Sequence, residues 1–150
     1  KCICEISIDN NLIGDELRNE EVASKASELA KNPKFRKEIV QIQRKAYDKD
    51  IGLIADGRDM GTVIFPEAIL KVFLQASPEI RAKRRAKQLK EKGMSVIMHD
   101  LLRQIQQRDK EDIHRKISPL RPADGSLLID TSNLSIKEVE KRVMENYKKL

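Results

Sequence analysis

Aromatic side chains are scarce in this sequence, which has no tryptophan, two tyrosines and three phenylalanines among 150 residues. Proteins that bind single-stranded nucleic acid usually stack bases on aromatic rings beside a basic groove. The basic helix expected over residues 78–92 has no such rings beside it. We therefore expect no nucleic-acid partner, although the net charge of +6 leaves a basic nucleic-acid-binding module as an alternative.

Cysteine is equally sparse, since only Cys2 and Cys4 are present. Two cysteines cannot build a disulfide framework. A C-x-C pair can contribute to a soft-metal site, but no histidine or further cysteine is close in sequence. We interpret the pair as structural or incidental thiols and expect a reducing, cytoplasmic compartment.

Long hydrophobic runs are absent as well. The run at 69–74 is interrupted by Lys71, and no segment is long enough to cross a bilayer, so we expect no membrane partner. No signal peptide is visible. Because Lys1 takes the place of an initiating methionine and Cys4, Ile6 and Ile8 already alternate with polar residues, we interpret the sequence as entered partway through.

Short apolar runs alternate with amphipathic segments along the chain. This pattern predicts an α/β fold with a parallel sheet covered by helices on both faces, residues 1–50 being a candidate inserted subdomain. Val22, Ala26 and Leu29 should face inward from a helix capped by Asn19. The expected strands cover residues 4–8, 51–55, 68–76 and 126–131, and the expected helices begin near 20, 33, 78, 100 and 136.

The segment 56–62, with the sequence D-G-R-D-M-G-T, directly follows an expected strand. Ligands of open α/β sheets bind beyond the carboxyl ends of strands. Arg58 offers a planar fork for a phosphate, and Asp59 can accept hydrogen bonds from an amine or hydroxyl group. The alternative is an Asp-Gly turn with solvated charges.

Charged residues at helical spacing form two further candidate sites. Arg108, Asp112 and Arg115 lie on one face of an expected helix, as either a phosphate clamp or a surface ion-pair ladder. The basic helix over 78–92 either is simply solvated or binds polyphosphate or nucleic acid. His99 and His114 are isolated, so no metal-site spacing is present, and the 150 residues contain no phosphate loop of the form G-x-x-x-x-G-K-[ST].

Several stretches together closely resemble the bacterial cytidylate (CMP) kinases over essentially the whole chain. They are residues 18–27, 52–68, 81–85, 88–93, 108–112, 118–120 and 129–136, of which the G-R-D-M-G-T part is highly specific. The resemblance implies a P-loop nucleoside monophosphate kinase fold. Residues 1–50 would be its NMP (pyrimidine)-binding insert and residues 51–150 the C-terminal part of its core, with a lid at about 84–118. It also implies that the chain is the C-terminal two-thirds of the protein, without the central first strand and the P-loop.

The resemblance further implies phosphoryl transfer from ATP to CMP or dCMP with Mg²⁺, in pyrimidine nucleotide metabolism. We expect a monomer when the protein is complete, with a separate chain supplying the N-terminal part as an alternative. We expect these residues alone to be inactive, and a non-catalytic remnant is a further alternative. The implied roles are cytosine recognition by Ser27, Arg36 and Asp59, phosphate binding and catalysis by Arg58, Arg108 and Arg115, a ribose contact from Asp112, ATP-side lid residues Arg84 and Arg85, and Mg²⁺ binding through water by Asp56.

Overall fold

The computed structural model describes residues 6–8, 11–13, 20–30 and 32–150. The chain divides into two compact units, Lys1–Leu53 and Ile54–Leu150, and each is described by itself. Among the described residues, none of the helices has the length and apolar character needed to cross a membrane. Cys2, Cys4 and the expected cap Asn19 lie outside the described residues.

The first unit contains a hairpin and two helices. Strands β1 (Ile6–Ile8) and β2 (Asn11–Ile13) pair antiparallel, with Ile6 opposite Ile13. Helices α1 (Glu20–Leu29) and α2 (Pro33–Lys45) follow. The strand predicted over 4–8 is confirmed for its last three residues, whereas β2 is not among the strands predicted from the sequence.

Helix α2 starts where the sequence predicts. The Asn32 side chain accepts hydrogen bonds from the backbone N–H groups of Lys34 and Phe35, and Pro33 occupies the first helical position. The expected inward packing of α1 is wrong, because Val22 is 36% and Leu29 is 49% exposed. Helical periodicity identifies residues that share a face, but it does not determine what covers that face.

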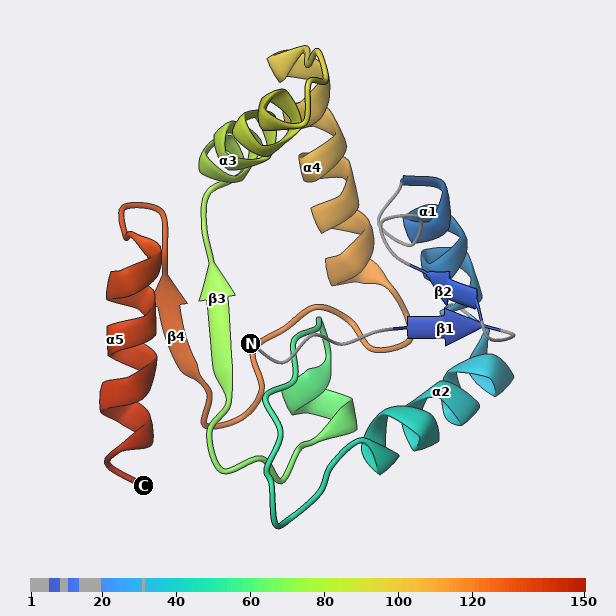
Figure 1. The fold of residues 1–150 in the computed structure, drawn as a ribbon, viewed down its shortest axis with the longest axis vertical. Helices are drawn as coiled ribbons and strands as arrows, with labels where there is room; N and C mark the ends of the chain where they lie inside the picture. The colour runs from blue at the N-terminus through green and yellow to red at the C-terminus, as the bar shows by residue number, and fades with distance from the viewer. Residues whose placement is uncertain (1–5, 9–10, 14–19, 31) are drawn as a thin grey trace. The chain divides into compact units, whose positions relative to one another are not determined.

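The second unit contains a two-stranded parallel sheet flanked by helices (Figure 1). Strand β3 (Val72–Gln75) pairs with β4 (Leu127–Asp130), and Val72 lies opposite Leu127. The parallel pairing is confirmed, although both strands are shorter than predicted. Two backbone hydrogen bonds extend the ladder, from Leu127 N to Lys71 O at 2.8 Å and from Thr131 N to Gln75 O at 2.7 Å.

The strand predicted over 51–55 is wrong. This stretch is irregular, and the side chains of Ile51 and Ile54 are 85% and 101% exposed. A strand needs a neighbour to satisfy its backbone polar groups, and none of the described strands pairs with this stretch. The sheet is likewise not fully covered, since Leu74 and Leu128 are both 55% exposed.

Three helices complete the second unit. Helix α3 (Pro78–Glu91) is capped by Ser77 and ends before Gly93, whose φ of +76° suits glycine. Helix α4 (Met98–His114) packs against α3. Helix α5 (Ile136–Tyr147) begins at the predicted position with a capping box, in which Ser135 and Glu138 cap one another's backbone N–H groups. The buried apolar residues of the described part are Ile64, Ala82, Ala86 and Ile129.

Candidate functional site

The segment after residue 55 closes into a short π-helical turn, η2 (Met60–Ile64), which the sequence did not predict. The backbone carbonyl of Asp59 accepts hydrogen bonds from Val63 N at 2.9 Å and Ile64 N at 3.2 Å. Ile64 is fully buried, and Asp59 is only 4% exposed. The turn therefore fixes the backbone at Asp59 and places a carboxylate in a largely dehydrated position.

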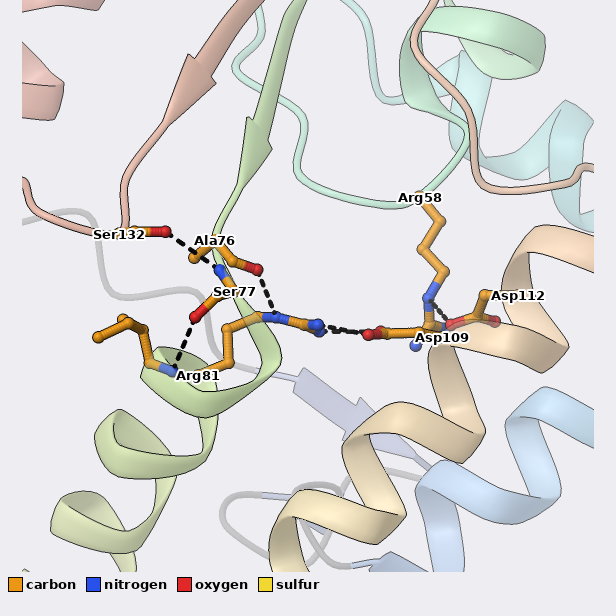
Figure 2. Close-up of polar contacts among 8 residues, drawn as sticks. Arg58, Ala76, Ser77, Arg81, Asp109, Asp112 and Ser132 are labelled. Carbon is orange, nitrogen blue, oxygen red and sulfur yellow. Dashed lines mark hydrogen bonds and ion pairs between the residues drawn. The ribbon is translucent and has the colours of Figure 1, made fainter.

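Arg58 and Asp112 connect this segment to the C-terminal end of α4 (Figure 2). The Arg58 Nε atom lies 2.7 Å from Asp112 Oδ2, and Asp112 is 6% exposed. On the other side, Arg115 Nη1 lies 3.8 Å from Asp112 Oδ1. The motif at 56–62 and the helical triad thus form one cluster. For Asp112, a solvated surface ladder is excluded, because the carboxylate is buried.

Positive charge exceeds negative charge in this cluster. Burial lowers the pKa of Arg58, and the charges of Arg108 and Arg115 lower it further, while the carboxylate of Asp112 raises it. Two guanidinium groups, those of Arg58 and Arg115, thus contact one buried carboxylate, and the charges of Arg108 and Asp109 also act on Arg58. A doubly charged phosphate would relieve this mutual repulsion and accept forked hydrogen bonds from the arginines.

A tight loop after α4 fixes the direction of Arg115. Its Nε atom donates a hydrogen bond to the carbonyl oxygen of Ser118, which has a φ of +51°. The backbone N–H of Leu120 donates to the carbonyl oxygen of Asp112 at 2.8 Å. The loop thus folds back on the end of the helix and holds Arg115 beside Asp112. Sequence reasoning missed this contact, because it depends on an unusual backbone angle at a serine.

The two expected lid arginines lie elsewhere on α3. Arg84 donates from Nη1 to Thr131 Oγ1 at 3.1 Å and from Nη2 to the Thr131 carbonyl oxygen, which ties α3 to the end of β4. Arg85 is half-buried. In this conformation, Arg84 acts as a structural bridge between α3 and the segment that leads into α5.

Arg81 and Asp109 form a second ion pair close to the cluster (Figure 2), and neither residue was expected to have a role of its own in the site. Arg81 Nη1 donates to Asp109 Oδ1 at 2.8 Å, and Nη2 contacts Oδ2. The adjacency of Asp109 to Arg108 was the available signal, but nothing in the sequence indicated its partner.

The expected cytosine-binding residues are divided between the units. Ser27 lies in α1 and Arg36 in α2, both in the first unit, whereas Asp59 belongs to the second. In the first unit, Ser27 and Arg36 lie on different helices. Their joint action stays a prediction.

The described ranges contain no group of three or more metal-ligating side chains. Asp56, the expected Mg²⁺ residue, is an exposed single carboxylate. Magnesium is commonly held by one or two carboxylates together with substrate phosphates and water. Asp56 fits such a partial site, in which the substrate supplies other ligands.

The known proteins to which this chain is similar belong to one family. The family model described as Cytidylate kinase matches residues 3–149. The chain is 44% identical over 143 residues to the cytidylate kinase of Vibrio vulnificus (strain CMCP6), covering 95% of this chain and 63% of that protein. It is 48% identical over 143 residues to that of Burkholderia ambifaria (strain MC40-6), covering 95% and 62%. The chain therefore spans a little less than two thirds of the length of these curated relatives.

Proposed function

This chain belongs to the cytidylate kinase family, and from that premise we propose that the protein transfers the γ-phosphoryl group of ATP to CMP or dCMP. The observation that carries the proposal is the buried carboxylate of Asp112 with Arg58 at 2.7 Å and Arg115 at 3.8 Å. Such a cluster suits the phosphate of a nucleoside monophosphate better than a neutral ligand, because its positive charge is in excess.

Arg58, Arg108 and Arg115 are the proposed phosphate-binding and catalytic residues. Phosphoryl transfer asks for little covalent chemistry from the protein, so positioning and charge stabilisation provide most of the catalysis. The arginines would hold the acceptor phosphate in line with the transferred group and neutralise the charge on its oxygens. No general base is needed, because the acceptor phosphate is already ionised at pH 7.

Recognition of the nucleoside is assigned to four residues. Asp112 would accept a hydrogen bond from the ribose hydroxyls. Asp59 would accept from the amino group of cytosine, which distinguishes cytosine from uracil, and Arg36 would donate to the ring carbonyl and N3. Ser27 would add a further hydrogen bond to the base. In this assignment, residues 1–50 form the pyrimidine-binding insert and residues 51–150 belong to the kinase core.

The ATP side would be served by Arg84 and Arg85, within a lid at about 84–118. Closing a lid over the phosphates excludes water and suppresses hydrolysis of ATP. Magnesium, held by Asp56 through water and by the substrate phosphates, would supply neutralising charge at the phosphate oxygens. Arg84 would have to leave Thr131 to reach a nucleotide.

The phosphates of ATP need a further cradle. These 150 residues contain no G-x-x-x-x-G-K-[ST] loop, and such loops hold the β- and γ-phosphates in P-loop kinases. We therefore expect that the 150 residues alone bind CMP without phosphorylating it. An assay of ATP-dependent CDP formation by this chain, with its folding checked by circular dichroism, tests this part. Substantial turnover would overturn it.

Titration with CMP tests the proposed recognition. We expect saturable binding of CMP that is weakened by the substitution Asp59→Ala, with binding of UMP much weaker than binding of CMP. A short RNA serves as the competing ligand. Binding of RNA that falls steeply with salt and is indifferent to Asp59→Ala would instead indicate a basic nucleic-acid-binding module. Absence of CMP binding in a cooperatively melting sample would indicate a non-catalytic remnant.

A further inference from the structure

Arg81 joins three segments of the second unit at one point (Figure 2). It lies in the first turn of α3, and its Nε atom donates a hydrogen bond to the carbonyl oxygen of Ala76, just after β3, at 3.1 Å. Its two terminal nitrogens contact the two carboxylate oxygens of Asp109 on α4. One side chain thus links the end of the sheet, the start of one helix and the middle of the next.

The sheet side of this junction is itself anchored. The backbone N–H of Ser77 donates to Ser132 Oγ at 3.1 Å, across from the end of β4. The Ser77 hydroxyl oxygen accepts a hydrogen bond from Ile80 N at 3.3 Å and caps α3. These hydrogen bonds therefore hold the backbone between β3 and α3, from which Arg81 extends. The two contacts of the Arg81 guanidinium group then determine where Asp109 lies.

Asp109 lies on α4 next to the residues of the proposed phosphate site. It follows Arg108 directly and precedes Asp112 by three residues, about one helical turn. Its charge also acts on Arg58, where it raises the pKa against the effect of burial. A rotation or shift of α4 at Asp109 would move Arg108 and Asp112 relative to Arg58.

We propose that Arg81 and Asp109 are positioning residues for the phosphate site, which register α4 against the β3–α3 corner so that Arg108 and Asp112 face Arg58. This inference rests on the proposed function. The pair is partly exposed, with side-chain accessibilities of 36% and 26%. Exposed pairs add little stability, but small misplacements of reacting or binding groups reduce function strongly. The main contribution of the Arg81–Asp109 pair is therefore to position α4, and its contribution to stability is small.

The test compares CMP with cytidine as ligands of Asp109→Asn and Arg81→Met variants. Both variants should weaken CMP binding by about tenfold or more. Cytidine lacks the phosphate and keeps only the proposed ribose contact of Asp112 at this site, so its affinity should fall clearly less than that of CMP. Asp109→Glu, which keeps the carboxylate, should recover part of the CMP affinity. Glu145→Gln is the matched control, because it removes one charge from the exposed pair of Lys141 and Glu145 on α5.

Three outcomes would overturn the inference. In the first, Asp109→Asn binds CMP as tightly as the unmodified protein. In the second, CMP and cytidine lose affinity equally, which indicates general destabilisation. In the third, Glu145→Gln has the same effect as Asp109→Asn. Failure of the proposed function is distinguishable from all three, because the unmodified protein itself would then bind no CMP.

Discussion

Two aspartates on consecutive turns of α4 each bind an arginine from another segment, and the two contacts differ in kind. Asp112 is buried and contacts Arg58 from the loop before η2. Asp109 is half-buried and contacts Arg81 from α3. In the first contact, burial dominates and lowers the pKa of the arginine. In the second, the hydrogen bond to the carboxylate dominates and raises it.

This difference separates a binding site from a structural contact. At Asp109, one guanidinium group, that of Arg81, contacts one carboxylate, so the two charges balance. At Asp112, two arginines, Arg58 and Arg115, contact a single carboxylate and the charge of Arg108 also acts on Arg58, so an excess of positive charge is left for a ligand to balance. We infer that an anion should bind at Asp112 and that Asp109 should act only through the position of the helix.

The substitution Asp112→Asn should have the largest effect. It removes the buried partner of Arg58 and the proposed ribose acceptor. Loss of one member of a buried charge pair costs about 2 kcal/mol or more, which corresponds to roughly thirtyfold in affinity. Isothermal titration with CMP measures this loss. Asp124→Asn, on an exposed loop residue, is the control, and equal affinities in the two variants would remove the distinction drawn above.

Arg58→Lys should have the next largest effect. Lysine keeps the positive charge but loses the planar fork, so we expect CMP affinity to fall by about tenfold, or ~1.4 kcal/mol. Arg121→Lys, at an exposed position, should leave affinity unchanged. If Arg58→Lys binds CMP normally, charge alone is sufficient at this position and the forked geometry has no role.

Much of this architecture could be predicted from sequence. The helix starts expected near 33, 78 and 136 are confirmed. Such starts are predictable because the caps that set them, Asn32, Ser77 and Ser135, are local interactions between a side chain and the next turn. The parallel pairing of β3 and β4 was also predictable from the alternation of strands and helices. The strand expected over 51–55 failed, since pairing depends on a neighbour that the local sequence does not define.

The candidate site, like the fold, could be predicted from the sequence only in part. The helical spacing of Arg108, Asp112 and Arg115 predicted a shared face, and Asp112 and Arg115 do lie together. The contact of Arg58 with Asp112 joins residues 54 positions apart in sequence, and the spacing of neither motif could predict it. The same holds for Arg81 and Asp109. Periodicity orders residues along one helix, whereas tertiary packing decides which helices and loops meet.

Double-mutant cycles should rank the two contacts by their contribution to folding. Removal of Arg81 and Asp109 singly and together should give a coupling energy of about 0.5–1 kcal/mol, because the pair is partly exposed although bidentate. The same cycle for Arg58 and Asp112 should give a larger value, of roughly 1–3 kcal/mol, because the carboxylate is buried. Urea unfolding measures both. A larger coupling for Arg81 with Asp109 would contradict the small contribution to stability that its partial exposure predicts, and with it the mainly geometric role proposed for the pair.

The smallest effect on CMP binding should come from Ser135→Ala, which separates stability from positioning. Loss of this helix cap should reduce the free energy of unfolding by about 1 kcal/mol. CMP affinity should not change, because the cap contacts neither aspartate.

Hydrogen bonds from Ser135 also hold the pKa of Glu138 below its usual 4.5. Their stabilisation is therefore complete above that pH and is lost as the pH falls through the lower pKa of the folded state. Unfolding of the Ser135→Ala variant should accordingly depend less on pH below about 4.5 than unfolding of the unmodified protein. If Ser135→Ala weakened CMP binding as much as Asp109→Asn, affinity would follow overall stability, and the separate positioning role of Asp109 would have no support.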